Sequence, residues 1–104
     1  MAKQVKLGRQ LLTTLDDITD LIDVTHDEDR LKDLEEQRSK VLKQLGDLVE
    51  AHLDSSGKKY RDATSGLQAA SATIRDAIKG MESVASAIKQ IAKAIDLITE
   101  LVPK

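Results

Sequence analysis

An uninterrupted apolar heptad pattern runs from Tyr60 to Val102 and limits what this chain can fold into. Its first positions are Tyr60, Leu67, Ile74, Met81, Ile88, Ile95 and Val102, and its fourth positions are Ala63, Ala70, Ala77, Val84, Ile91 and Ile98. Steps of three and four residues bring side chains onto one face of a helix. No charged residue breaks this face, so the segment must bury it against other helices.

Two further helices are predicted before this segment. The first covers about residues 3–23 and the second about residues 26–53. Their apolar faces are Leu7, Leu11, Leu15, Ile18 and Ile22 in the first, and Leu31, Leu34, Val41, Leu42, Leu45, Leu48 and Val49 in the second. Thr25 precedes Glu28 by three positions, the spacing of a capping box at the start of a helix. The stretch LDSSGKK predicts a loop, in which Gly57 suits a left-handed backbone near a helix end.

The composition agrees with one all-α domain covering residues 1–104. The chain has one aromatic residue and one proline. Strands are enriched in aromatic and β-branched residues, and turns in Gly, Pro and Asn. Charged residues make up 33% and hydrophobic residues 40%, which indicates a folded chain rather than a disordered one.

The heptad segment fits two architectures. In the favoured one, residues 58–102 form one coiled-coil-like helix of about 65–70 Å, and the two earlier helices cover only its first part in a three-helix bundle. In the alternative, the chain turns at Gly80 and forms an antiparallel four-helix bundle, with Ser83 as the N-cap of the last helix. The continuous helix is favoured because the heptad passes through Gly80 without a change of register.

The favoured architecture predicts a partner-binding surface. The end of the long helix would extend past the other two and leave its apolar side chains bare: Met81, Val84, Ile88, Ile91, Ile95, Ile98 and Val102. Burying each large one would contribute roughly 1.5–3 kcal/mol, so we expect another protein chain to cover them. A second copy or another helical protein would serve, and a homo-oligomer is expected.

Residues suited to chemistry are sparse. The chain has no cysteine, and His26 lies among aspartates without the turn glycine of a calcium loop. His52 is predicted in the last turn of the second helix, where a cation is favoured. Arg38 is expected at the edge of the core, and Tyr60 at the end of the bundle. We therefore predict no catalytic residue, metal or cofactor.

The function expected from these features is a non-enzymatic helical module for protein–protein interaction, such as an adaptor, an inhibitor or an immunity-type protein. A net charge of −2 argues against nucleic acid. The alternative is a membrane-surface protein that releases residues 81–102, but the mixed charges of that segment argue against it. The absence of a signal peptide or transmembrane pattern predicts a cytoplasmic protein.

Overall fold

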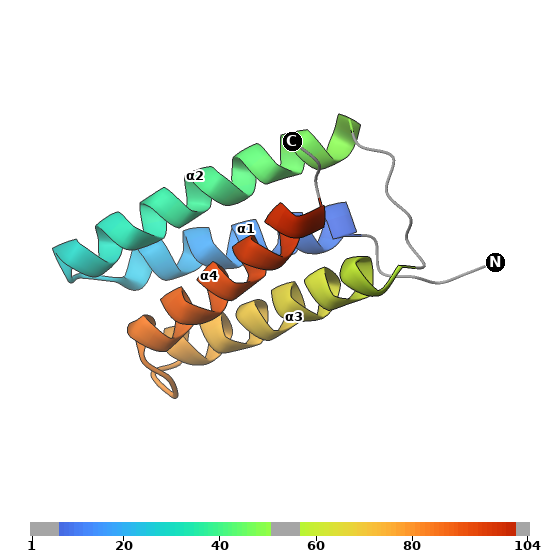
Figure 1. The fold of residues 1–104 in the computed structure, drawn as a ribbon. Coiled ribbons are helices and arrows are strands. Elements are labelled where there is room, and N and C mark those ends of the chain that lie inside the picture. Colours follow the sequence, from blue (N-terminus) through green and yellow to red (C-terminus); the bar gives the residue numbers. More distant parts are fainter. Residues whose placement is uncertain (1–6, 51–56, 102–104) are drawn as a thin grey trace.

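Four helices make up the described part of the chain (Figure 1). The computed structural model describes residues 7–50 and 57–101, without the side chains of residues 48–50. The helices are α1 (Leu7–Val24), α2 (Glu28–Glu50), α3 (Lys58–Ile78) and α4 (Val84–Leu101), and these ranges contain no strand. The predicted all-α bundle is confirmed. The favoured continuous helix over residues 58–102 is wrong, and the alternative with a break at Gly80 holds.

The break is a glycine-terminated helix end. Gly80 has a φ of 81°, in the left-handed region that favours glycine. Its N–H donates to the carbonyl of Ala77 at 3.1 Å, and the N–H of Met81 donates to the carbonyl of Asp76 at 2.8 Å. These two bonds form a Schellman motif, which satisfies the last carbonyls of α3. Ser83 then caps α4, since its Oγ accepts from the N–H of Ser86 at 3.1 Å.

Packing explains why the chain turns instead of continuing. The turn folds the apolar face of α4 back onto the same core that α3 faces, so Ile91 and Ile98 become buried without a partner. The molecule measures only 41 Å along its longest axis. The unbroken heptad does not contradict the turn. Both α3 and α4 need an apolar face, and in each helix the apolar heptad residues follow one another at steps of three or four positions.

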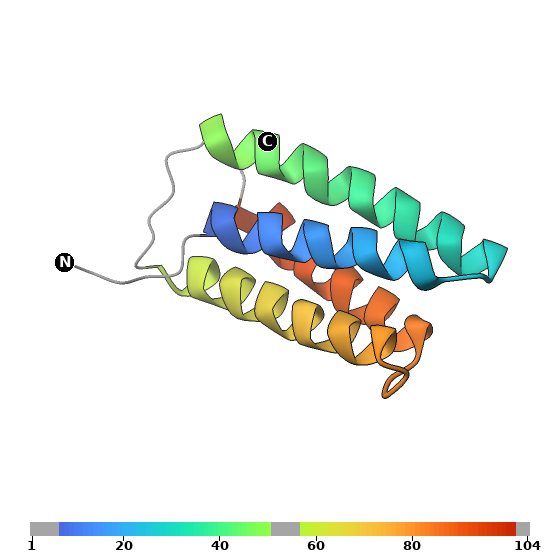
Figure 2. The same ribbon diagram turned by 180° about the vertical axis from the view of Figure 1, so that it is seen from behind.

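The helices form a ring in the order α1, α2, α4, α3 (Figures 1 and 2). The hairpins α1–α2 and α3–α4 are antiparallel, whereas α1 runs parallel to α3 and α2 parallel to α4. Among the described residues, α2 and α3 are consecutive in the chain but occupy diagonal positions. The bundle is therefore two antiparallel hairpins laid side by side.

The core is built mainly by α1, α3 and α4. Its buried apolar members are Leu7, Leu11, Ile18, Leu21, Leu34, Val41, Ala63, Leu67, Ala70, Ile74, Ala87, Ile91, Ala94 and Ile98. Among the described side chains, α2 supplies only Leu34 and Val41 to this set. The helix with more exposed charged residues than any other described helix is thus the one least anchored by apolar burial.

Two predicted details at helix ends are wrong. Thr25 does not cap α2, because α1 continues to Val24 and the Thr25 hydroxyl donates to the carbonyl of Leu21 at 2.6 Å. Asp27 takes the capping role, since its Oδ1 accepts from the N–H groups of Asp29 and Arg30 at 2.9 and 3.2 Å. Gly57 is the N-cap of α3 in an extended conformation, with φ −72° and ψ 153°, and is not left-handed.

Candidate interaction surface

The predicted partner-binding residues of the C-terminal stripe lie mostly inside the bundle. Ile91 and Ile98 are buried core residues, so their prediction as a bare surface is wrong. Three others are half-buried and pack against the core: Val84, Ile88 and Ile95. Met81 is 73% exposed because it lies in the α3–α4 turn. Val102 lies outside the described residues.

Small residues of the heptad segment let α3 and α4 approach closely. A Cβ added at Gly66 would lie 2.7 Å from Leu97 Cδ1 and 3.8 Å from Ala94 Cα. Ala87 and Ala94 are both buried on α4. The close approach that these small side chains allow is therefore within the molecule.

Among the described side chains, four large apolar ones are well exposed: Leu12, Val24, Leu42 and Met81. Val24 ends α1 and Met81 follows α3, so both lie at the end of the bundle that holds the two hairpin turns. Leu12 and Leu42 are 49% and 57% exposed and lie within α1 and α2. Sequence periodicity placed Leu42 in the apolar face of its helix and did not identify it as a surface residue.

Leu12 and Leu42 lie at the same level of the α1–α2 hairpin. A Cβ added at Gly8 would lie 4.0 Å from Leu45 Cδ1, which puts these two positions opposite each other. Because the helices are antiparallel, advancing from Gly8 to Leu12 and stepping back from Leu45 to Leu42 lead in the same direction. At 1.5 Å per residue the two steps cover about 6 and 4.5 Å.

Both leucines also project from the outer side of the contact between α1 and α2. On α2, Leu45 faces α1, and Leu42 lies three residues earlier on the same flank, farther from the core. Leu15 and Leu45 are half-buried beneath this position and pack against the core. We call the surface formed by Leu12, Leu15, Leu42 and Leu45 the α1–α2 patch.

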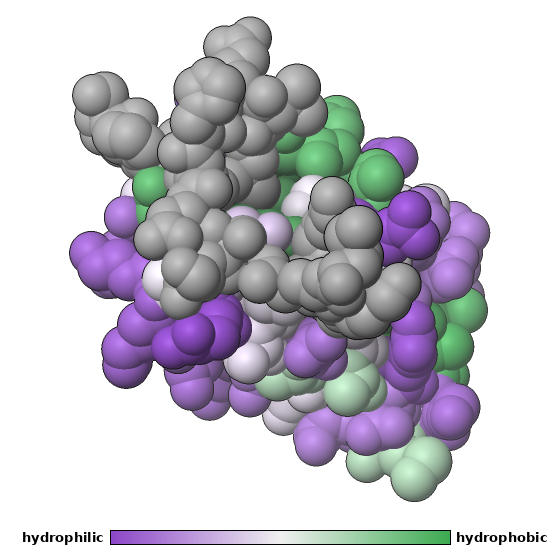
Figure 3. Space-filling view, turned by 90° about the vertical axis from the view of Figure 1, so that its right-hand side faces the viewer, coloured by the Kyte–Doolittle hydropathy of each residue, from purple (hydrophilic) through white to green (hydrophobic). Residues whose placement is uncertain are grey.

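The end of the bundle beside this patch is mixed in polarity. Figure 3 shows hydrophobic residues at its upper right, beside hydrophilic residues that make up most of the coloured surface. Scattered apolar residues are normal on a protein surface, whereas a large contiguous apolar patch is a feature of interaction sites.

The opposite flank of α2 makes a polar contact with α4. Gln37 Nε2 donates to the carbonyl of Ile88 at 2.9 Å, and Gln44 Nε2 donates to the carbonyl of Ile95 at 3.1 Å. Gln44 Nε2 also lies 3.1 Å from Thr99 Oγ1. The Oε1 atoms of both glutamines are buried without a hydrogen-bond partner among the described residues. Both pairs have the same sequence separation, so they fix one parallel register between α2 and α4.

Polar contacts also set the register between α1 and α3. The hydroxyl of Tyr60 accepts from the N–H of Leu7 at 2.8 Å, which joins the first turns of the two helices as expected for a residue at the bundle end. Thr14 Oγ1 lies 2.9 Å from Ser71 Oγ in the core. Asp17 is buried, and its Oδ1 pairs with Arg75 Nε at 3.4 Å.

The remaining residues considered for chemistry are separate from one another. His26 and Arg38 are exposed, and His52 lies outside the described residues. Within residues 7–50 and 57–101, no group of three or more histidines, cysteines or carboxylates is placed to hold a metal ion. In the same part of the chain, no helix has the length and apolarity needed to cross a membrane.

Comparison of the chain with protein-family models, characterised proteins and solved structures gives no match.

Proposed function

We propose that this protein is a non-enzymatic helical module that binds another protein chain, either a second copy or a different helical protein. The observation that supports this is the exposure of Leu12 and Leu42 at the same level of the α1–α2 hairpin, above half-buried Leu15 and Leu45. The binding surface is the α1–α2 patch. It replaces the α4 stripe, because Ile91 and Ile98 already have partners inside the molecule.

The physical basis of binding is burial of the patch. Removing a large aliphatic side chain fully from water contributes roughly 1.5–3 kcal/mol. Leu12 and Leu42 are each about half exposed, so burying the rest of each side chain would contribute about half of that amount. Ordering side chains and losing rotational freedom oppose association. The two leucines therefore supply only part of the binding free energy, and neighbouring contacts with the partner must supply the rest. An adaptor, an inhibitor and an immunity-type protein would all use such a surface in the same way.

The membrane-surface alternative is not proposed. It requires residues 81–102 to leave the bundle, and that release would expose Ile91 and Ile98 together with the core residues of α1 and α3 that cover them. No observation within the described residues favours such an opening.

Chemical crosslinking of the protein in its own cells tests the proposed function. The wild-type chain should give a crosslinked adduct of defined mass, and the double variant Leu12→Ser/Leu42→Ser should lose it. The matched control is Val24→Ser/Met81→Ser, which removes the other two large apolar side chains that are well exposed in the described part of the chain, and it should keep the adduct. No adduct from the wild-type chain, or one that survives loss of both patch leucines, would contradict the proposal.

A further inference from the structure

Apolar burial holds α2 to the bundle less firmly than it holds the other helices. Among the described side chains, α2 supplies Leu34 and Val41 to the buried apolar core, and all the other members belong to α1, α3 and α4. Two further positions on its inner side are polar, since Gln37 is buried and Gln44 is half-buried. Most of the stability of a helix in a protein comes from packing its apolar face. The described part of α2 therefore gains the least from packing.

The contact between α2 and α4 also leaves two amide oxygens unpaired. Gln37 and Gln44 each donate through Nε2, to the carbonyls of Ile88 and Ile95, but their Oε1 atoms are buried without a hydrogen-bond partner among the described residues. Burying an acceptor in this way costs free energy, because it gives up its hydrogen bonds to water. Separating α2 from α4 restores those bonds. The third buried atom of this kind, Asp17 Oδ2, belongs to a carboxylate whose other oxygen pairs with α3.

The other three helices are joined to one another by contacts that do not involve α2. The hydroxyl of Tyr60 accepts from the N–H of Leu7, and the hydroxyls of Thr14 and Ser71 are 2.9 Å apart, so both pairs join α1 to α3. A Cβ added at Gly66 would lie 2.7 Å from a side chain of α4, which shows how closely α3 and α4 pack. All these contacts remain in place if α2 leaves.

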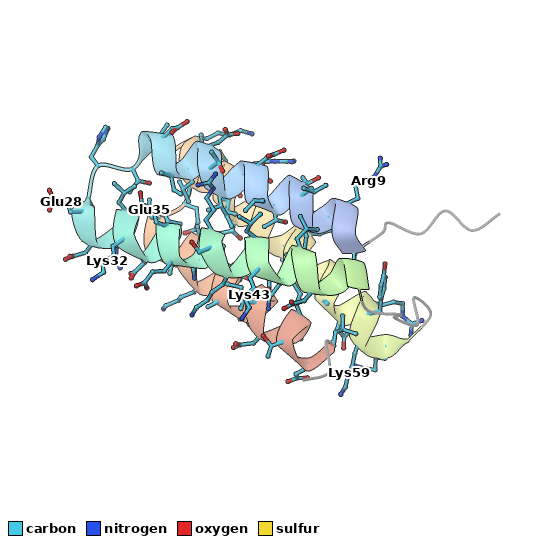
Figure 4. The ribbon with its side chains drawn as sticks, turned by 90° about the horizontal axis from the view of Figure 1, so that it is seen from above. Arg9, Glu28, Lys32, Glu35, Lys43 and Lys59 are labelled. Atoms are coloured by element: carbon cyan, nitrogen blue, oxygen red, sulfur yellow. The ribbon has the colours of Figure 1, made fainter. Side chains whose placement is uncertain are left out.

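The position of α2 makes its departure a separate event. It contacts α1 and α4, which are diagonal to each other in the ring, and among the described residues it makes no contact with α3. Figure 4 looks onto the bundle from the side of α2 and labels four of its exposed charged residues: Glu28, Lys32, Glu35 and Lys43. Departure of α2 exposes the core faces of α1 and α4, while these charged residues stay in water throughout.

We propose that α2 opens from the bundle as a unit while α1, α3 and α4 stay packed together. The closed state predominates, and opening requires less free energy than unfolding of the whole chain. Once detached, α2 loses the packing that maintains its helix, so its backbone N–H groups become accessible to solvent.

The opening would control the α1–α2 patch. Leu12 and Leu15 come from α1, and Leu42 and Leu45 come from α2, so the patch exists only in the closed state. A partner that binds the patch would therefore hold α2 closed, because it has affinity for one of the two states only. This consequence rests on the proposed function, whereas the opening itself does not.

Hydrogen exchange of the backbone amides, measured by nuclear magnetic resonance on the full chain, tests the opening. The amides from Leu34 to Val41 are suitable because they lie away from both ends of α2. After correction for intrinsic rates, they should exchange at least about tenfold faster than the slowest amides of α1, α3 and α4. The two rates should converge as urea is added, because opening α2 exposes less surface than unfolding the whole chain.

Two variants distinguish opening of α2 from global unfolding. Ser71 contacts Thr14 between α1 and α3, and the open state keeps that contact. Ser71→Ala should therefore speed the slowest exchange of α1, α3 and α4 about fivefold and leave the exchange of α2 unchanged. Gln37→Leu removes an unpaired oxygen that is buried in the closed state only, so it should slow the exchange of all four helices by the same factor, also about fivefold. Circular dichroism of both variants checks that the helices are retained.

The outcomes separate this inference from the proposed function. If α2 exchanged as slowly as the other helices, or if Ser71→Ala sped its exchange along with theirs, α2 would unfold only with the whole chain and the proposal would be overturned. Equally fast exchange in α1 and α2 would also overturn it, because the opening unit would then be the α1–α2 hairpin. These measurements need no partner, so their failure would leave the crosslinking test of the patch unaffected. Loss of the crosslinking result would remove only the link between opening and binding.

Discussion

At the scale of single residues, Gly80 carries the conformational requirement of the α3–α4 turn. Its φ of 81° is unfavourable for any residue with a Cβ, and an added Cβ would meet nothing within 4 Å. Gly80→Ala should therefore destabilise the protein through backbone strain alone, by about 1 kcal/mol or more. Urea denaturation followed by circular dichroism measures this change.

Gly46 is the control for that substitution. It lies within α2, and an added Cβ would also meet nothing within 4 Å. Since alanine favours the helix over glycine by about 1 kcal/mol, Gly46→Ala should stabilise the protein by a similar amount. If Gly80→Ala also raised the denaturation midpoint, Gly80 would not have a left-handed backbone conformation. The result would then support one continuous helix over residues 58–102.

A buried hydroxyl pair is the second feature that single residues control. Thr14 and Ser71 lie 2.9 Å apart, oxygen to oxygen, and both are buried. Thr14→Val and Ser71→Ala should each cost about 1 kcal/mol in the free energy of unfolding, because each removes one partner of a buried polar group. The double variant should cost less than the two together. Strict additivity in this double-mutant cycle would contradict the contact.

At the scale of helices, periodicity predicted where apolar faces lie but not where the last helix turns. The face of Leu7, Leu11 and Ile18 is buried as predicted. A heptad pattern shows only which side of a helix is apolar. Two antiparallel helices that face the same core both need such a side, so the pattern can run on through the turn between them. The local signal for that turn was Gly80 followed by Ser83, which now form the end of α3 and the cap of α4.

The polar flank of α2 fixes its register and limits its stability. Gln37 is buried, and its Nε2 donates to the carbonyl of Ile88 in α4. Its Oε1 has no hydrogen-bond partner among the described residues. Gln37→Leu keeps a similar volume and removes the unpaired oxygen, so it should raise the free energy of unfolding by about 1 kcal/mol. Gln37→Glu would bury a charge at the same place and should lower it. A stabilising effect of the glutamate would contradict the buried, unpaired environment.

At the scale of the whole molecule, the surface could not be derived from the heptad pattern. Which apolar residues are left exposed depends on how far each helix is rotated about its axis, and only packing decides that rotation. Leu42 belongs to the predicted apolar face of its helix, yet α2 turns Leu34 and Val41 inward and leaves Leu42 57% exposed. Conversely, Ile91 and Ile98 seemed bare only because the turn at Gly80 was not expected.

A pair of substitutions in the predicted stripe tests the assembled bundle. Ile91 is 1% exposed and belongs to the core, whereas Met81 is 73% exposed, although both belong to the apolar face of the heptad segment. Ile91→Ala should lower the free energy of unfolding by about 2–5 kcal/mol, as is usual for an aliphatic residue truncated in a packed core. Met81→Ala should change it by less than about 0.5 kcal/mol.

The manner of unfolding provides the second readout. Because α4 packs on α3 and α2, and α1 joins them through the same core, loss of Ile91 weakens all four helices together. Circular dichroism should therefore show one transition over the whole helical signal in the variant, at a lower urea concentration than in the wild-type chain. A variant that lost only the part of the signal belonging to α4, with the remaining helices as stable as before, would mean that α4 is an independent segment outside the common core.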